Sequence, residues 1–325
     1  MKRLKETVLL LLILVILLCS CSKSLTTQWQ EEYDLGVRYL SEGNYEEAVI
    51  SFTAAIEIAP LLVDGYLMLS EAHIEMGNAE QAAETLFLGW QNCPDDSQLI
   101  IDRLEQIGYY INENGELISF QELETSAISA YREIQDTIYY GLSSQWQNIE
   151  YNSIGEANLD ISYLWYRFPG QTLSNSGYLI DDLNGDHIPE LIISTADAME
   201  SGYAVGMIYD LYTYQDGQVV HLISSGERDR YYLCEDSVIA NEGSAGAADS
   251  MYCYYELSGN TDELSLIEQV RYYGIETPDT PWYYGTTNTI DISEMVQIAE
   301  AEATSIIEQY THIPLDLTLF TDYSP

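Results

Sequence analysis

Apolar residues recur three or four positions apart from Trp29 to about residue 108, a spacing that predicts amphipathic helices. Gly43 and Asn44 interrupt this spacing and separate two helical stretches. The pattern then returns after 34 residues, a period typical of stacked helix-turn-helix repeats. Residues 97–108 continue it as a third or capping helix. The positions that correspond across the period are Ala48 and Ala82, Phe52 and Leu86, and Pro60 and Pro94.

Two short elements are expected after the repeats. Residues 112–115 read Asn-Glu-Asn-Gly, a turn signal that predicts a hairpin between 109–111 and 117–120. Apolar residues at helical spacing predict an amphipathic helix over 127–138. The region 109–150 is therefore expected to join two domains.

After about residue 150 the hydrophobic period shortens toward two, which favours β-strands. Asp216 and Gly217 tolerate positive φ and predict a hairpin between the strands on either side. Asp291, with Glu294 three residues later, has the pattern of a capped helix start and predicts a helix over 291–310. Strands are predicted at 191–194, 207–214, 219–223, 230–234, 251–257, 264–273 and 282–290.

The expected fold class is thus α+β. An N-terminal α-solenoid, made of two helical repeats and a capping helix, precedes a mainly antiparallel β domain with a late C-terminal helix.

The charge of the chain excludes one class of partner. Its 325 residues include 53 Asp and Glu but only 11 Lys and Arg, which gives a formal net charge of −42. Binding to a phosphate backbone requires clustered basic residues, so nucleic acid is excluded as a direct partner. The 46% hydrophobic content argues against a disordered chain.

The first residues have the pattern of a secretory signal. Three basic residues lie within the first six positions, and an aliphatic run from Val8 to Leu18 follows, too short to cross a bilayer. The segment Leu18-Cys19-Ser20-Cys21 resembles the lipobox of bacterial lipoproteins. That resemblance implies cleavage after residue 20, acylation of Cys21 and an extracytoplasmic chain that is lipid-anchored to the cell membrane. The alternative is an ordinary secretory signal in which the cysteines are accidental.

The repeat region resembles the tetratricopeptide repeat. The first repeat carries seven residues of that pattern, and the second is weaker because Ser70, His73 and Gly89 replace three of them. Such repeats leave a concave surface that binds a partner, although two repeats also suit a spacer or docking platform. A generic pair of helical hairpins is the other alternative. The matching residues of the first repeat are Leu35, Gly36, Tyr39, Ala48, Phe52, Ala55 and Pro60.

Repeat geometry predicts which positions line the concave surface, which we call the groove. Its mixture of apolar and acidic side chains suits a protein or peptide partner with hydrophobic and basic residues. The predicted groove residues are Gln30, Tyr33, Val37, Leu40, Asp64, Leu67, Glu71, Ile74 and Glu75.

One loop has a pattern of oxygen-bearing residues that is typical of a metal site. Residues 182–190 place side-chain oxygens at the first, third, fifth and ninth positions, immediately before a strand. Alternating oxygen donors on a tight turn can surround a hard cation such as Ca²⁺. The loop resembles the calcium loops of FG-GAP domains and of a C-terminal domain in clostridial-type lipoproteins. That resemblance implies one Ca²⁺, held by the side chains of Asp182, Asn184, Asp186 and Glu190 and by the carbonyl of Ile188.

The loop departs from that family at His187, where glycine is usual because the residue adopts a left-handed conformation. Histidine visits that conformation more often than most residues do. The twelfth position is Ile193, so the loop is not a full EF-hand. The alternative is an acidic turn that opens a strand without a metal.

Catalytic patterns are not found in the sequence. Ser244 lacks the leading glycine of a nucleophile elbow, and the four histidines lie in unrelated elements. Cys234 and Cys253 fall on neighbouring predicted strands, so a disulfide is open, although free buried thiols are preferred.

The expected organisation is a signal peptide at 1–20, a lipidated tether at 21–28, repeats at 29–62 and 63–96, a cap at 97–108, a linking region at 109–150 and a β-rich domain at 151–325. We expect a cell-surface lipoprotein that binds or scaffolds a protein or peptide partner, without catalytic activity. A cell-wall hydrolase that uses the β domain and a solute-binding lipoprotein of a transporter are the alternatives.

Overall fold

The computed structural model describes residues 25–112, 114–146, 161–162, 164–167, 170–196, 206–215, 217–246, 248–258, 263–274 and 281–325. The signal segment and Cys21 lie outside these residues. The chain divides into two compact units, one that ends at Gln121 and one that begins at Glu122. Among the described residues, no helix is both long and apolar enough to cross a bilayer.

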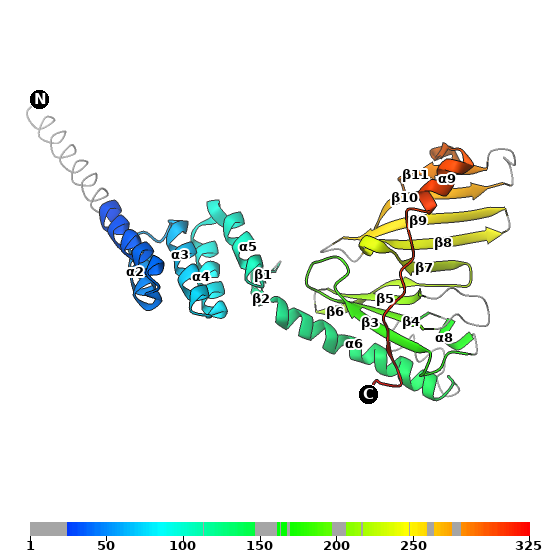
Figure 1. The fold of residues 1–325 in the computed structure, drawn as a ribbon, viewed down its shortest axis with the longest axis horizontal. Coiled ribbons are helices and arrows are strands. Elements are labelled where there is room, and N and C mark those ends of the chain that lie inside the picture. The colour runs from blue at the N-terminus through cyan, green and yellow to red at the C-terminus, as the bar shows by residue number, and fades with distance from the viewer. Residues whose placement is uncertain are drawn as a thin grey trace, which may run out of the picture. The chain divides into compact units, whose positions relative to one another are not determined.

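The first unit consists of successive helices that pack against their neighbours in the chain (Figure 1). The two glycines of the inter-helix turns, Gly43 and Gly77, have φ values of 76° and 77° and are 34 residues apart, so the period of the sequence is repeated in the backbone. The elements are the helix 25–41, α2 (Tyr45–Ile58), α3 (Val63–Glu75), α4 (Ala79–Asn92), η1 (Pro94–Asp96), α5 (Ser97–Gln106), β1 (Tyr109–Ile111) and β2 (Leu117–Ser119).

Small residues let the helices of this unit approach closely. A Cβ atom on Gly36 would lie 2.6 Å from the ring of Phe52, which is fully buried. In the second repeat a Cβ on Gly89 would lie 2.9 Å from Tyr66. Contacts this short are sterically forbidden, so glycine is required at both crossings.

The second unit is built on an antiparallel sheet, which confirms the predicted fold class. Within the described residues eleven strands form it, in the order β12-β11-β10-β9-β8-β7-β5-β4-β3-β13, with β6 paired to β5. The strands are β3 (Ser176–Asp181), β4 (Glu190–Thr195), β5 (Met207–Gln215), β6 (Gln218–Ser224), β7 (Asp229–Leu233), β8 (Ile239–Gly246), β9 (Asp249–Leu257), β10 (Leu264–Tyr273), β11 (Trp282–Gly285), β12 (Val296–Gln297) and β13 (Thr318–Leu319).

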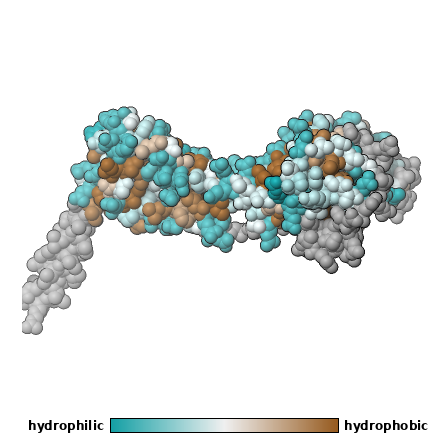
Figure 2. Space-filling view, turned by 90° about the horizontal axis from the view of Figure 1, so that it is seen from below, coloured by the Kyte–Doolittle hydropathy of each residue, from teal (hydrophilic) through white to brown (hydrophobic). Residues whose placement is uncertain are grey.

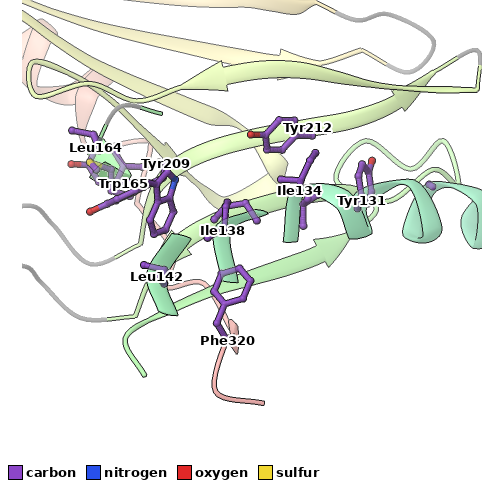
Figure 3. Close-up of a cluster of buried hydrophobic side chains, with 14 residues drawn as sticks. Tyr131, Ile134, Ile138, Leu142, Leu164, Trp165, Tyr209, Tyr212 and Phe320 are labelled. Atoms are coloured by element: carbon purple, nitrogen blue, oxygen red, sulfur yellow. The ribbon is translucent and has the colours of Figure 1, made fainter. Parts of the chain in front are cut away.

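Helix α6 (Phe120–Ser143) is longer than the predicted 127–138 and supplies much of the core of the second unit. Its apolar stripe packs on β4 and β5 and on the short helix α8 (Leu164–Arg167), as Figure 3 shows. A separate cluster, with Ile192, Ile208 and Leu211, covers the opposite face of the same strands. The helix residues in the core are Ala127, Tyr131, Ile134, Ile138 and Leu142.

The predicted helix over 291–310 is wrong in its first half. Residues Ile292–Glu294 form a short 3₁₀ turn, η3, and α9 spans only Glu300–Ile307. An earlier 3₁₀ turn, η2, spans Glu235–Ser237. The intervening β12 pairs with β11, with Val296 opposite Tyr284, so sheet hydrogen bonds replace helical ones. Asp291 does cap a turn, because its side chain accepts a hydrogen bond from the Ser293 N–H at 2.9 Å.

The strand predicted at 282–290 is also too long, because β11 ends at Gly285. The thiols of Cys234 and Cys253 are buried and free, and burial raises the pKa of each to about 11. Cys234 packs in a cluster with Tyr254. Since neighbouring strand residues point to opposite faces, Cys253 lies on the other side of the sheet, and no disulfide joins the pair.

Candidate functional site

The predicted groove residues lie on the first helices of the two repeats. The helix 25–41 carries Gln30, Tyr33, Val37 and Leu40, and α3 carries the remaining positions, Asp64, Leu67, Glu71, Ile74 and Glu75.

Tyr33 packs between Trp29 of its own helix and Phe52 of α2. Its ring stacks on Trp29 with 4.9 Å between centroids and meets the ring of Phe52 edge-on at 5.9 Å. Burial raises the pKa of the Tyr33 hydroxyl, and the nearby carboxylates of Asp64 and Asp34 raise it further. Tyr33 therefore presents its hydroxyl beside acidic groups from its own helix and from α3.

The centre of the groove is apolar and partly open. Val37 is 37% exposed, whereas Leu40 and Leu67 pack partly against the two buried clusters of the unit. Figure 2 shows hydrophobic side chains gathered over the helical repeats on the face in view. The exposed side chain of Val37 is available for contact with a partner.

Two of the predicted acidic residues are already engaged within the unit. Glu71 forms an ion pair with Arg103 of α5, a residue that sequence reasoning missed. Glu75 accepts a hydrogen bond from the Tyr45 hydroxyl at 3.0 Å. Asp64 is exposed and forms no hydrogen bond or ion pair within the described part of the chain. Asp64 is thus the acidic group best placed to meet a basic partner.

The predicted cation loop connects β3 to β4 and is organised around Asp182. One carboxylate oxygen of Asp182 accepts N–H hydrogen bonds from Gly185 at 2.8 Å and Asp186 at 3.2 Å, and the other accepts from His187 at 2.9 Å. His187 has a φ of 70°, the left-handed conformation expected where related loops have glycine. The backbone therefore turns tightly around the first predicted ligand.

Further hydrogen bonds hold the side chains of the other predicted ligands. The Asn184 carbonyl oxygen accepts from the Asp186 N–H at 3.0 Å, and its amide donates to Asp186 at 2.9 Å. The second Asp186 oxygen accepts from the Ile188 N–H at 2.8 Å. A carboxylate oxygen has two lone pairs, so these bonds leave acceptor capacity for a cation.

Glu190 is the last residue of the loop, and its side chain lies in the interior of the protein. Its side chain is fully buried and accepts hydrogen bonds from the Leu183 N–H at 3.0 Å and the Thr213 hydroxyl at 2.9 Å. Burial raises its pKa to about 7 despite those bonds, and the charges of Asp186 and Asp182 add to the shift. A cation would offset this desolvated charge. No three His, Cys, Asp or Glu side chains among the described residues are placed as a preformed ligand set.

A buried polar cluster in the sheet was not predicted. Asp210 of β5 is fully buried and accepts hydrogen bonds from the Ser162 N–H and the Trp165 indole, both at 2.8 Å. His221 lies 3.1 Å from the same carboxylate. Ser224 also donates to Asp210, at 3.4 Å, rather than to the His221 ring. The arrangement ties α8 to the sheet and does not form a Ser-His-Asp relay.

Comparison with protein families identifies one part of the chain. Residues 39–99 match the family model of the tetratricopeptide repeat. Comparison with curated proteins gives no match. The matched range runs from the end of the helix 25–41 into α5, so these stacked helices are tetratricopeptide repeats, a class of protein-interaction module.

Proposed function

We propose that this chain is a membrane-anchored, extracytoplasmic lipoprotein whose tetratricopeptide unit binds a protein or peptide partner. The observation that carries the proposal is the groove, in which the exposed Val37 and Asp64 lie on the first helices of the two repeats. Catalytic activity is not part of the proposal.

The chemistry of the groove favours a partner with apolar and basic side chains. Val37 and its partly buried neighbours offer apolar contact, and Asp64 offers an accessible carboxylate. Glu71 is a weaker site for a basic side chain, because Arg103 already neutralises it. Such a partner would also be steered by the negative charge of the whole chain.

A pull-down from detergent-solubilised membranes tests the groove, with residues 22–325, which lack the acylated Cys21, as bait. Val37→Asp and Asp64→Lys should each reduce capture of the partner about tenfold or more, since each removes ~1.4 kcal/mol or more of binding free energy. Ile50→Asp is the matched control, because Ile50 is 69% exposed on α2, outside the groove. Equal capture by all three variants would contradict the proposal, as would turnover of cell-wall fragments by the chain.

The lipid anchor is proposed from the N-terminal sequence. The segment Leu18-Cys19-Ser20-Cys21 supports acylation of Cys21, and an anchor with two acyl chains is sufficient for stable attachment to a bilayer. After cleavage the chain would retain 8 basic and 52 acidic residues, so anionic lipid would repel it and the anchor alone would hold it at the membrane.

Metabolic labelling with a palmitate analogue tests this anchor. Cys21→Ser should abolish the label and release the chain from the membrane fraction. Cys19→Ser, which changes the neighbouring cysteine in the same way, should leave both unchanged. Labelling that persists in Cys21→Ser would refute the assignment.

We further propose that the loop 182–190 binds one Ca²⁺ that stabilises the second unit. The support is the buried carboxylate of Glu190, together with the oxygen atoms of Asp182, Asn184 and Asp186 on one tight turn. Ca²⁺ prefers such oxygen donors and would offset the charge that burial disfavours.

Isothermal titration calorimetry and thermal unfolding test this site. The chain should bind one Ca²⁺ and gain ~2.7 kcal/mol of stability at a free calcium concentration a hundredfold above the dissociation constant. Asp186→Ala should abolish both effects, whereas Asp316→Ala, at an exposed position with the same change in charge, should retain them. No heat and no thermal shift in the wild type would exclude the site.

A further inference from the structure

Three neighbouring strands of the second unit, β7, β8 and β9, carry a row of polar side chains on one face. Their register places Arg230 opposite Glu242, and Glu242 opposite Tyr252. In the row beyond, Ser244 pairs with Ser250, and the Ser244 N–H bonds to the Arg228 carbonyl at 2.9 Å. Because alternate residues of a strand share a face, these two rows form one polar surface.

The adjacent row on the same face is covered. It contains Tyr232, Ala240 and Tyr254, on which the segment after α9 packs. The His312 ring stacks on Tyr232 with 4.1 Å between centroids, and the Tyr310 ring stacks on Tyr254 at 3.6 Å. That segment crosses the sheet in Figure 1. The polar rows therefore lie beside it, where the face is open.

A pocket of about 450 Å³ occupies this open part of the face. That volume is within the range of sites for small molecules. Its polar lining consists of Arg228, Arg230, Glu242, Ser244, Ser250 and Tyr252.

Arg228 of the pocket is exposed and differs from the arginines that pair with an acid. Arg103 pairs with Glu71, and Arg271 holds Asp249 at 2.8 Å. Arg228, by contrast, makes no side-chain hydrogen bond or ion pair within the described residues. The Arg230 guanidinium is oriented by the Glu227 carbonyl, which accepts from its Nε at 3.3 Å and its Nη2 at 3.2 Å.

The pocket lining contains one acidic side chain, Glu242, which does not neutralise both arginines. Glu242 lies 3.4 Å from the Nε2 atom of His312, and burial lowers the pKa of that histidine. The pocket thus combines two guanidinium groups with one carboxylate, in a chain where acids outnumber bases 53 to 11. With so many carboxylates available, Arg228, which pairs with none among the described residues, is placed to receive an anion from solution.

We propose that this pocket binds a small sugar acid or sugar phosphate. Its carboxylate or phosphate would be held by Arg228 and Arg230, because a guanidinium presents several N–H donors to an oxyanion. Its hydroxyl groups would donate to Glu242 and exchange hydrogen bonds with Ser244, Ser250 and Tyr252. This site is separate from the groove and from the loop 182–190, and it does not depend on the function proposed for either.

Titration of the mature chain with glucuronate, glucose 6-phosphate and glucose, followed by NMR, tests the proposal. At least one of the two anions should bind saturably with a dissociation constant in the millimolar range or tighter, and glucose should bind more weakly than that anion. The tighter of the two anions identifies whether carboxylate or phosphate is preferred. Absence of saturable binding by both anions, or binding of glucose with equal affinity, would overturn the proposal.

Variants locate the binding in the pocket. Arg228→Gln, in an exposed turn, and Arg230→Gln should each weaken binding of the preferred anion about tenfold or more, which corresponds to ~1.4 kcal/mol. Arg132→Gln is the matched control, since Arg132 lies on α6 in the same unit and the change removes the same charge. Thermal unfolding of each variant shows whether it is folded. Equal weakening by Arg132→Gln would assign the effect to net charge and contradict the pocket.

Discussion

The large excess of acidic side chains is the constraint on which the structure depends. With 53 acids and 11 bases, nearly all carboxylates must remain solvated while tyrosine and aliphatic side chains fill the interior. Within the described residues only Glu190 and Asp210 are buried carboxylates, and each accepts hydrogen bonds from two or more groups. One organises the loop before β4, and the other fixes α8 to the sheet. Among the described residues, Arg103 and Arg271 pair with an acid, and Arg132 and Arg230 donate to a carbonyl.

The two units bury their apolar side chains in different ways. In the repeats, glycine at the helix crossings lets Phe52 and Tyr66 fill the space between helices, and the first helices are left to form a surface. In the second unit α6 covers β4 and β5, and the segment after α9 covers part of β7–β9. What stays uncovered in each unit is the groove in one and the arginine pocket in the other. Both sites therefore lie on faces that are not needed to build the hydrophobic core.

Local and periodic signals were predictable from the sequence, and contacts between distant residues were not. The 34-residue period and the Asp216-Gly217 turn predicted real elements, because the first repeats a helical spacing and the second acts over a few residues. Strand β8 was missed, since its two glycines, its serine and its polar residues give no hydrophobic alternation. The helix predicted at 291–310 failed because pairing with β11 at the sheet edge outweighed helical spacing. Arg103 and the arginine pocket depend on tertiary packing and strand register, which no spacing rule reveals.

The central claim is that the first helices of the repeats form the surface that a partner contacts at the cell surface. The most direct measurement is photo-crosslinking in intact bacterial cells that express the full chain, with a benzophenone side chain at position 37 in one strain and at position 50 in another. Both positions are exposed, but only Val37 lies in the groove. The account predicts a discrete crosslinked protein from position 37 and none from position 50. The same products from both positions, or products from position 50 alone, would contradict it.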